Sequence, residues 1–243
     1  MDILEQLKND ADYYGAVGKQ FLSNSDIGVL LTNPQAFGVD REDNKNFAEG
    51  RYFHQLLIEP DKAKNVLFVD ASTRNTNIYK DFIKENGIEI CLLKKEKEDI
   101  ENLAGIIKGN IQFYDEIFKS DSKYEVPAVK MIHGRMWKGK TDIENPTFLI
   151  DLKTTSDINK FKYSAKTYNY DSQAYIYQEL FGKPLVFYVI DKETGQLGIF
   201  HPSENFIRGG EAKVVKAIEV YDKYFGPNAI DDIQNYFINE VLD

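Results

Sequence analysis

The sequence predicts an α/β fold in which helices flank a central mixed β-sheet. Residues 124–155 read as three consecutive strands, with turns near residues 133–134 and 144–146. Two shorter strands are predicted at 185–190 and 197–200. Segments with apolar residues at three- and four-residue spacing precede and follow these strands, and that spacing is typical of amphipathic helices. Together these patterns favour a sheet covered by helices.

The first part of the chain is predicted to be helical, with connecting loops. Ser23, Asn24 and Ser25 can cap a helix that runs through Leu31, and Asn33-Pro34 ends it. Further along, apolar residues predict a helix from about 46 to 58, which carries His54 and stops at Glu59-Pro60. We expect an N-terminal helical part over residues 1–65.

Residues 66–118 are expected to alternate between short strands and helices. Strands are predicted at 66–69 and 88–93, on either side of a helix at 78–86 that Gly87 ends. Apolar residues from Ile100 to Phe118 then keep a helical spacing and predict one long helix.

The second half of the chain should form the core. After the strands of 124–155 we expect a helix over 168–181, the strands at 185–190 and 197–200, and a closing helix over 211–225. A hairpin turn at 144–146 would bring Asp142 back beside Asp151. We expect a single domain over 1–243, with its core at 124–225.

The composition excludes several classes of protein. Cys91 is the single cysteine and lies in an apolar stretch, so a disulfide, an iron–sulfur cluster or a thiolate zinc site is not expected. No apolar run approaches the roughly 20 residues of a membrane span. The sequence starts without a basic and apolar leader, which predicts a cytoplasmic protein with no membrane partner.

The net charge of −9 hides a local basic segment. From Lys153 to Tyr170 the charged residues are four lysines and one aspartate. Such a segment could bind a polyanion despite the acidic total, because binding depends on the local potential.

Asp142 and the run Asp151-Leu152-Lys153 are the most informative residues of the chain. On a strand, Asp151 and Lys153 share a face about 7 Å apart. Two carboxylates with a nearby ammonium could hold Mg²⁺, orient a water molecule and offset charge on a phosphate. An Asp-x-Lys pattern is also common on exposed strand faces, but here it follows the apolar run Phe148-Leu149-Ile150, where ionised groups need partners.

Several other residues admit two interpretations. Gln173 and Tyr177 share a helix face, which indicates either a half-buried stripe or contacts to a nucleic-acid strand. Lys160, Lys162 and Lys166 alternate with aromatic residues, as in a solvated loop or a phosphate-binding segment. His133 and His201 lie in turn or strand-end positions and are given no role.

The sequence resembles the PD-(D/E)XK nuclease superfamily and, within it, exonuclease VIII-type phage recombination exonucleases. The resemblance is strongest from Phe148 to Gly210, and residues 23–60 resemble the N-terminal block of that family. It implies a restriction-endonuclease-like core. Residues 61–123 match nothing in it, Thr141 stands where the family pattern has proline, and the residue before Leu152-Lys153 is Asp rather than Glu.

The resemblance implies a role for each matching residue. Asp142, Asp151, His54 and the Leu152 carbonyl would bind Mg²⁺, with Mn²⁺ as the alternative, and Lys153 would be the catalytic lysine. Gln173, Tyr170 and Tyr177 match the family's helix after the motif strand and would contact DNA. Glu125 is a further candidate carboxylate.

The resulting expectation is a metal-dependent deoxyribonuclease that degrades linear double-stranded DNA from its ends, 5′ to 3′, in recombination or repair. The family resemblance also implies a ring-shaped homo-oligomer and a single-strand annealing protein as partner. Two alternatives stay open, namely a structure-specific or restriction-like endonuclease and a non-catalytic DNA- or protein-binding module on the same fold.

Overall fold

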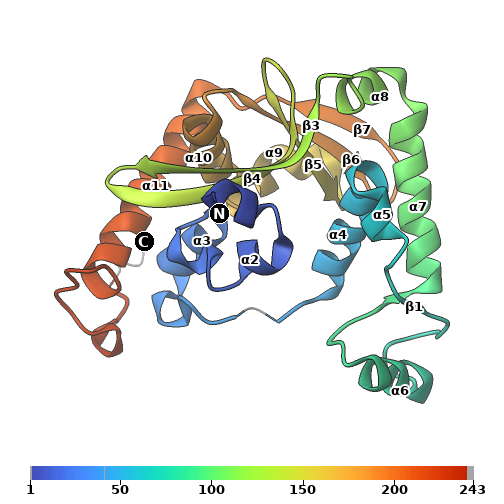
Figure 1. Cartoon of the computed structure of the whole chain (residues 1–243), viewed down its shortest axis with the longest axis horizontal. Helices are drawn as coiled ribbons and strands as arrows, with labels where there is room; N and C mark the ends of the chain where they lie inside the picture. The colour runs from blue at the N-terminus through green and yellow to red at the C-terminus, as the bar shows by residue number, and fades with distance from the viewer. Residues whose placement is uncertain (1, 41, 240–243) are drawn as a thin grey trace.

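A computed structural model describes residues 2–40 and 42–239 and contains a central five-stranded sheet (Figure 1). The strand order is β3-β4-β5-β6-β7. β5 and β6 are parallel and the other neighbours antiparallel, so the sheet is mixed, as predicted. The five strands are β3 (Lys123–Ile132), β4 (Arg135–Glu144), β5 (Leu149–Thr155), β6 (Leu185–Asp191) and β7 (Leu197–Phe200).

Helices cover both faces of this sheet (Figure 1). The face that buries Phe187 packs against α3 (Asn24–Thr32), α9 (Phe161–Thr167), α10 (Tyr170–Phe181) and α11 (Glu204–Tyr224). The face that buries Tyr188 packs against α4 (Lys45–Ile58), α7 (Lys94–Gly109) and α8 (Ile111–Ile117). β6 is buried along its whole length because consecutive side chains point into opposite cores.

Short elements complete the described chain. They include the helices α1 (Ile3–Leu7), α2 (Asp10–Tyr14), α5 (Pro60–Ala63) and α6 (Asn77–Asn86). They also include the 3₁₀ helices η1 (Gly18–Gln20), η2 (Pro34–Ala36), η3 (Ile158–Lys160) and η4 (Ile233–Asn235). No helix in the described part of the chain has the length and apolar character needed to cross a lipid bilayer.

Most predicted elements are confirmed, including the three consecutive strands and the helix that carries His54. The expected long helix over 100–118 is wrong, because it divides into α7 and α8 at Asn110, whose side chain accepts from the Phe113 amide and caps a new helix. The expected strands at 66–69 and 88–93 shrink to β1 (Phe68–Val69) and β2 (Leu92–Leu93). These two strands form a separate parallel pair over a small cluster that includes Tyr79.

Two helical segments were not predicted to their full extent. The lysine-rich segment after β5 folds into η3 and α9 rather than a loop. α11 begins at Glu204, where the Ser203 hydroxyl accepts from the Phe206 amide, seven residues before the expected start. The glycine at position 210 argued against a helix there, but it has a packing role. A Cβ at Gly210 would lie 2.0 Å from the Asp171 carbonyl oxygen, so glycine lets α10 and α11 approach closely.

Candidate functional site

The site begins where β4 and β5 separate. Their pairing runs only from Ile143 opposite Ile150 to Glu144 opposite Leu149. Beyond it, the Asp142 carboxylate bridges the widening gap, because its Oδ2 accepts a 2.7 Å hydrogen bond from the Leu152 backbone amide. The predicted meeting of Asp142 with the Asp151-Leu152-Lys153 segment is therefore present.

α4 brings His54 to the same place. His54 Nε2 lies 2.8 Å from the Leu152 carbonyl oxygen, and Nδ1 lies 3.5 Å from Asp142 Oδ2. Burial acts to lower the pKa of His54, but the Asp142 carboxylate outweighs it and raises the pKa to about 9. Burial likewise opposes ionisation of Asp142, yet His54 and Lys153 hold its pKa below the usual value.

Glu125 is the third side chain that could bind a metal ion here, beside His54 and Asp142. The β3–β4 register pairs Tyr124 with Ile143 and Val126 with Thr141, which places Glu125 opposite Asp142. Ligand atoms of His54, Glu125 and Asp142 all lie within 4.8 Å of one another. Burial and the neighbouring Asp142 charge raise the pKa of Glu125 to about 7. Two carboxylates this close repel each other, and a cation between them would relieve that repulsion.

Asp151 and Lys153 form a second, adjacent pair. Lys153 Nζ lies 2.6 Å from Asp151 Oδ2, and Gln173 Nε2 donates a 2.6 Å hydrogen bond to Asp151 Oδ1. Burial raises the pKa of Asp151 although Lys153 opposes this, and Asp151 in turn raises the pKa of Lys153 against the effect of its burial. Lys153 also lies 4.9 Å from the centre of the Tyr170 ring.

The predicted metal ligands thus divide into two groups. His54, Asp142 and the Leu152 carbonyl come together, joined by Glu125. Asp151 lies beside this group but is not part of it. One of its carboxylate oxygens pairs with Lys153, and the other accepts a hydrogen bond from Gln173.

Two of the predicted DNA contacts are corrected by the structure. Gln173 and Tyr177 are buried in α10, and the Tyr177 hydroxyl donates a 2.9 Å hydrogen bond to the Lys140 carbonyl oxygen. They therefore support β4 and β5 from behind, because their polar ends are already hydrogen-bonded to Lys140 and Asp151 of those strands. Lys160, Lys162 and Lys166 are exposed on η3 and α9, and their role as DNA contacts stays a prediction.

Sequence reasoning missed the charges that surround Glu125. Lys140, on β4, lies 3.3 Å from Glu125 Oε2 and 2.5 Å from Asp10 Oδ1, so it ties the N-terminal segment to the site. The alternation of Lys140 with Asp142 along β4 was the only sequence signal for this residue.

The residues present fit a divalent cation. One ligand atom each from His54, Glu125 and Asp142 lie within 4.8 Å of one another, close enough for a single ion to lie between them. A metal-bound imidazole is neutral, so binding would release the proton that His54 holds beside Asp142. The donor set of carboxylate, imidazole and carbonyl groups suits Mg²⁺ or Mn²⁺, and it contains no thiolate.

Comparison with solved structures concerns the fold of the chain. A candidate structural relative, the crystal structure of a presumed exonuclease from Eubacterium rectale, is 17% identical with a TM-score of 0.63, and the match covers 97% of this chain and 96% of that one. This likeness shows a shared fold. The crystal structure of SSO0001 is 16% identical over 79% of this chain and 84% of the other, and its TM-score of 0.30 is too low to support any argument. The search of curated proteins found no match.

The family comparison covers most of the sequence. The profile of a family described as "PDDEXK-like domain of unknown function (DUF3799)" matches residues 32–225. That range includes His54, Glu125, Asp142, Asp151 and Lys153. The chain therefore belongs to this family of PDDEXK-like domains.

Proposed function

We propose that this protein is a divalent-metal-dependent deoxyribonuclease that hydrolyses linear double-stranded DNA from its ends. The observation that carries the proposal is the convergence of His54, Glu125, Asp142 and the Leu152 carbonyl beside the Asp151–Lys153 pair. A buried cluster of this kind has little structural value on its own, because each ionised group loses hydration energy. Its chemistry matches phosphodiester hydrolysis.

Each residue has a role that follows from its contacts. His54, Glu125, Asp142 and the Leu152 carbonyl would hold Mg²⁺ or Mn²⁺, which when bound supplies positive charge for the phosphate oxygens and lowers the pKa of water. Lys153 stays protonated beside Asp151, and it would stabilise negative charge on the phosphate and orient the attacking water. Gln173 holds Asp151, and Tyr170 packs below the Lys153 ammonium.

The finer assignments extend this proposal by family resemblance. We propose 5′ to 3′ polarity, a cytoplasmic location, a ring-shaped homo-oligomer around DNA and a single-strand annealing protein as partner, in recombination or repair. An oligomeric ring would let an acidic outer surface coexist with a basic passage lined by Lys160, Lys162 and Lys166.

The test compares linear and covalently closed circular DNA with the same protein, in Mg²⁺ or in EDTA. We expect loss of linear DNA only with Mg²⁺, no cutting of circles, and cleavage by Lys153→Ala that is slower by about 10²–10³-fold. Lys64→Ala, which removes an exposed lysine, is the matched control and should retain activity. Cutting of circles would favour the endonuclease alternative, and DNA binding without cleavage would favour the binding module. Cleavage that survives EDTA, or that Lys153→Ala leaves at the wild-type rate, would contradict the proposed chemistry.

A further inference from the structure

The catalytic-site strand β4 also carries two lysines on the face of Asp142. Lys138, Lys140 and Asp142 alternate along β4, and all three are buried. At about 3.3 Å per residue, Lys138 lies about 13 Å along the strand from Asp142. The line of charges therefore leads from the carboxylates toward the hairpin end of β4.

The two lysines differ in their partners. Lys140 is paired with both Asp10 and Glu125. The ammonium of Lys138 donates to the Tyr13 carbonyl oxygen and lies 4.2 Å from the centre of the Tyr13 ring. Among residues 2–40 and 42–239, no carboxylate lies within ion-pair distance of it, and the charge of Asp26 acts on it from farther away. A buried ammonium without a counterion leaves positive potential in its surroundings.

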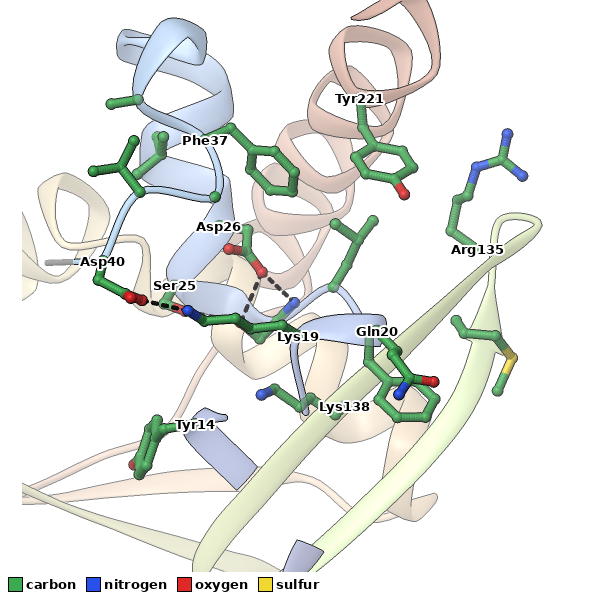
Figure 2. Close-up of a pocket in the computed structure, with 18 residues that line it drawn as sticks. Tyr14, Lys19, Gln20, Ser25, Asp26, Phe37, Asp40, Arg135, Lys138 and Tyr221 are labelled. Carbon is green, nitrogen blue, oxygen red and sulfur yellow. Dashed lines mark hydrogen bonds and ion pairs between the residues drawn. The ribbon is translucent and has the colours of Figure 1, made fainter. Parts of the chain in front are cut away.

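That potential lies against a cavity of about 580 Å³, a size typical of ligand-binding pockets. None of His54, Asp142, Asp151 and Lys153 lines it. In Figure 2, Phe37 and Tyr221 lie together on one side of the cavity, and Lys138 and Tyr14 lie on the other. Phe37 and Tyr221 are in edge-to-face contact, with ring centres 5.6 Å apart.

The other charged side chains of the cavity already have partners. Lys19 lies 2.5 Å from Asp40, and Arg135 Nε lies 2.6 Å from Asp222 Oδ1. Asp26, the carboxylate of α3 that lines the cavity, accepts hydrogen bonds from the Ser23 amide and hydroxyl. Lys138 is the cation that an incoming anion would neutralise. An ammonium facing aromatic rings is the combination that binds a phosphate and stacks a base in single-stranded nucleic-acid sites.

Tyr14 connects this cavity with the catalytic site. It is 68% exposed, it lines the cavity, and its ring centre lies 5.8 Å from Lys140 Nζ. A strand that passes Lys140 and the Tyr14 ring can therefore reach both the carboxylates and the cavity. Stacked nucleotides advance about 3.4 Å each, so 13 Å corresponds to about four of them.

We propose that this cavity binds one nucleotide of the DNA strand whose scissile phosphate lies at the carboxylates, with Lys138 contacting the phosphate of that nucleotide. The inference rests on the proposed function, because it takes the bound polymer to be DNA. It adds a second contact point on the strand, which would fix its position relative to the cut.

The test measures binding in EDTA, where cleavage cannot contribute. A fluorescently labelled single strand of about 12 nucleotides, within the usual range of strand-binding sites, is titrated with protein and followed by fluorescence anisotropy. We expect Lys138→Met to weaken binding about tenfold, equivalent to about 1.4 kcal/mol. The slope of log affinity against log salt should fall by about 0.7, the value for one phosphate of a single strand. Lys138→Arg should restore most of the affinity.

The control variant is Lys130→Met, on the neighbouring strand β3, where the lysine is half-exposed and lies 3.6 Å from Glu179. It should bind like the wild type. As a second readout, thymidine 5′-monophosphate should compete for the wild-type protein better than thymidine, which lacks the phosphate, and Lys138→Met should lose that preference.

Each outcome separates the two proposals. Equal affinity and equal salt slope for wild type and Lys138→Met overturn the inference while leaving the nuclease assignment intact. Equal competition by thymidine and its monophosphate overturns the phosphate contact. If the wild-type protein neither binds a strand nor cleaves DNA, the proposed function itself is overturned. If it binds a strand through Lys138 but never cleaves DNA, nucleotide binding in the cavity is supported and the nuclease assignment is overturned.

Discussion

The two ends of β4 handle buried charge in opposite ways. Near Asp142 every charged group has an oppositely charged neighbour, so His54, Asp142, Asp151 and Lys153 fix one another's positions. Near Lys138, within the described residues, the ammonium contacts a backbone carbonyl and an aromatic ring, and the Asp26 carboxylate acts on it beyond ion-pair distance. Charge balance gives a preorganised catalytic site, whereas charge imbalance leaves a place for an anion.

The strongest way to break this comparison is to remove the carboxylate at its centre. Asp142→Asn keeps the side-chain shape but removes the charge that holds His54 protonated and would bind the cation. We expect nuclease activity to fall about a thousandfold or more, which is the size of effect seen when a group that stabilises charge is removed from a catalytic site. Initial rates on linear DNA measure it, with Asp81→Asn on the exposed face of α6 as the control. A loss of less than tenfold would place Asp142 outside the chemistry.

Lys153→Ala should reduce the rate of DNA cleavage by about 10²–10³-fold, because negative charge on the phosphate loses its ammonium partner.

The same substitution should also change the stability of the protein. Asp151 is 2% exposed and would lose its cation, so its carboxyl group should take up a proton and the variant should melt at a lower temperature at neutral pH. Circular dichroism at several pH values measures this, and the difference from wild type should shrink as the pH falls and Asp151 is protonated in both states. A melting difference independent of pH would contradict the pairing.

Some features of the fold and the site are predictable from local sequence patterns, and others depend on tertiary packing. The strands, the helix carrying His54 and the Asp151-x-Lys153 pair follow from local periodicity and spacing. Glu125 lies opposite Asp142 only through the β3–β4 register, and Gln173 turns inward through the packing of α10 against the sheet. The cavity at Lys138 needs α3, η1 and the β3–β4 hairpin to meet, and no local pattern encodes that meeting.

A smaller effect is expected at the residue that positions Asp151. Gln173→Ala removes the amide donor of a 2.6 Å hydrogen bond and should lower activity about 10–100-fold, as for other residues that orient a functional group. The same change should raise the pKa of Asp151, so the acidic limb of the pH–rate profile should move to higher pH. Gln178→Ala, five residues further along α10, is the control. An unshifted pH profile with reduced activity would indicate a purely structural role.

The smallest effect concerns stability at the other end of β4. Burial, together with the charges of Lys140 and Lys19, lowers the pKa of Lys138 to about 8, although Asp26 opposes this. Because the unfolded value is about 10.5, the charged lysine costs stability below pH 8, and this cost disappears as the pH rises toward 10.5. Lys138→Met should therefore melt a few degrees higher than wild type at pH 7, with a difference that shrinks toward pH 10.5. A variant that melts lower at every pH would mean that Lys138 serves the fold.

The claim on which the rest depends is that His54, Glu125 and Asp142 form one site for a divalent cation. Calorimetric titration of the metal-free protein with Mn²⁺ at pH 8, without DNA, tests it directly. At that pH Glu125, whose pKa is raised to about 7, is ionised. His54, whose pKa is raised to about 9, would release its proton when the metal binds. We predict saturable binding to the wild type that is lost in Asp142→Asn and retained in Asp81→Asn. Mn²⁺ binding of equal strength to Asp142→Asn, or no binding to the wild type, would contradict the account.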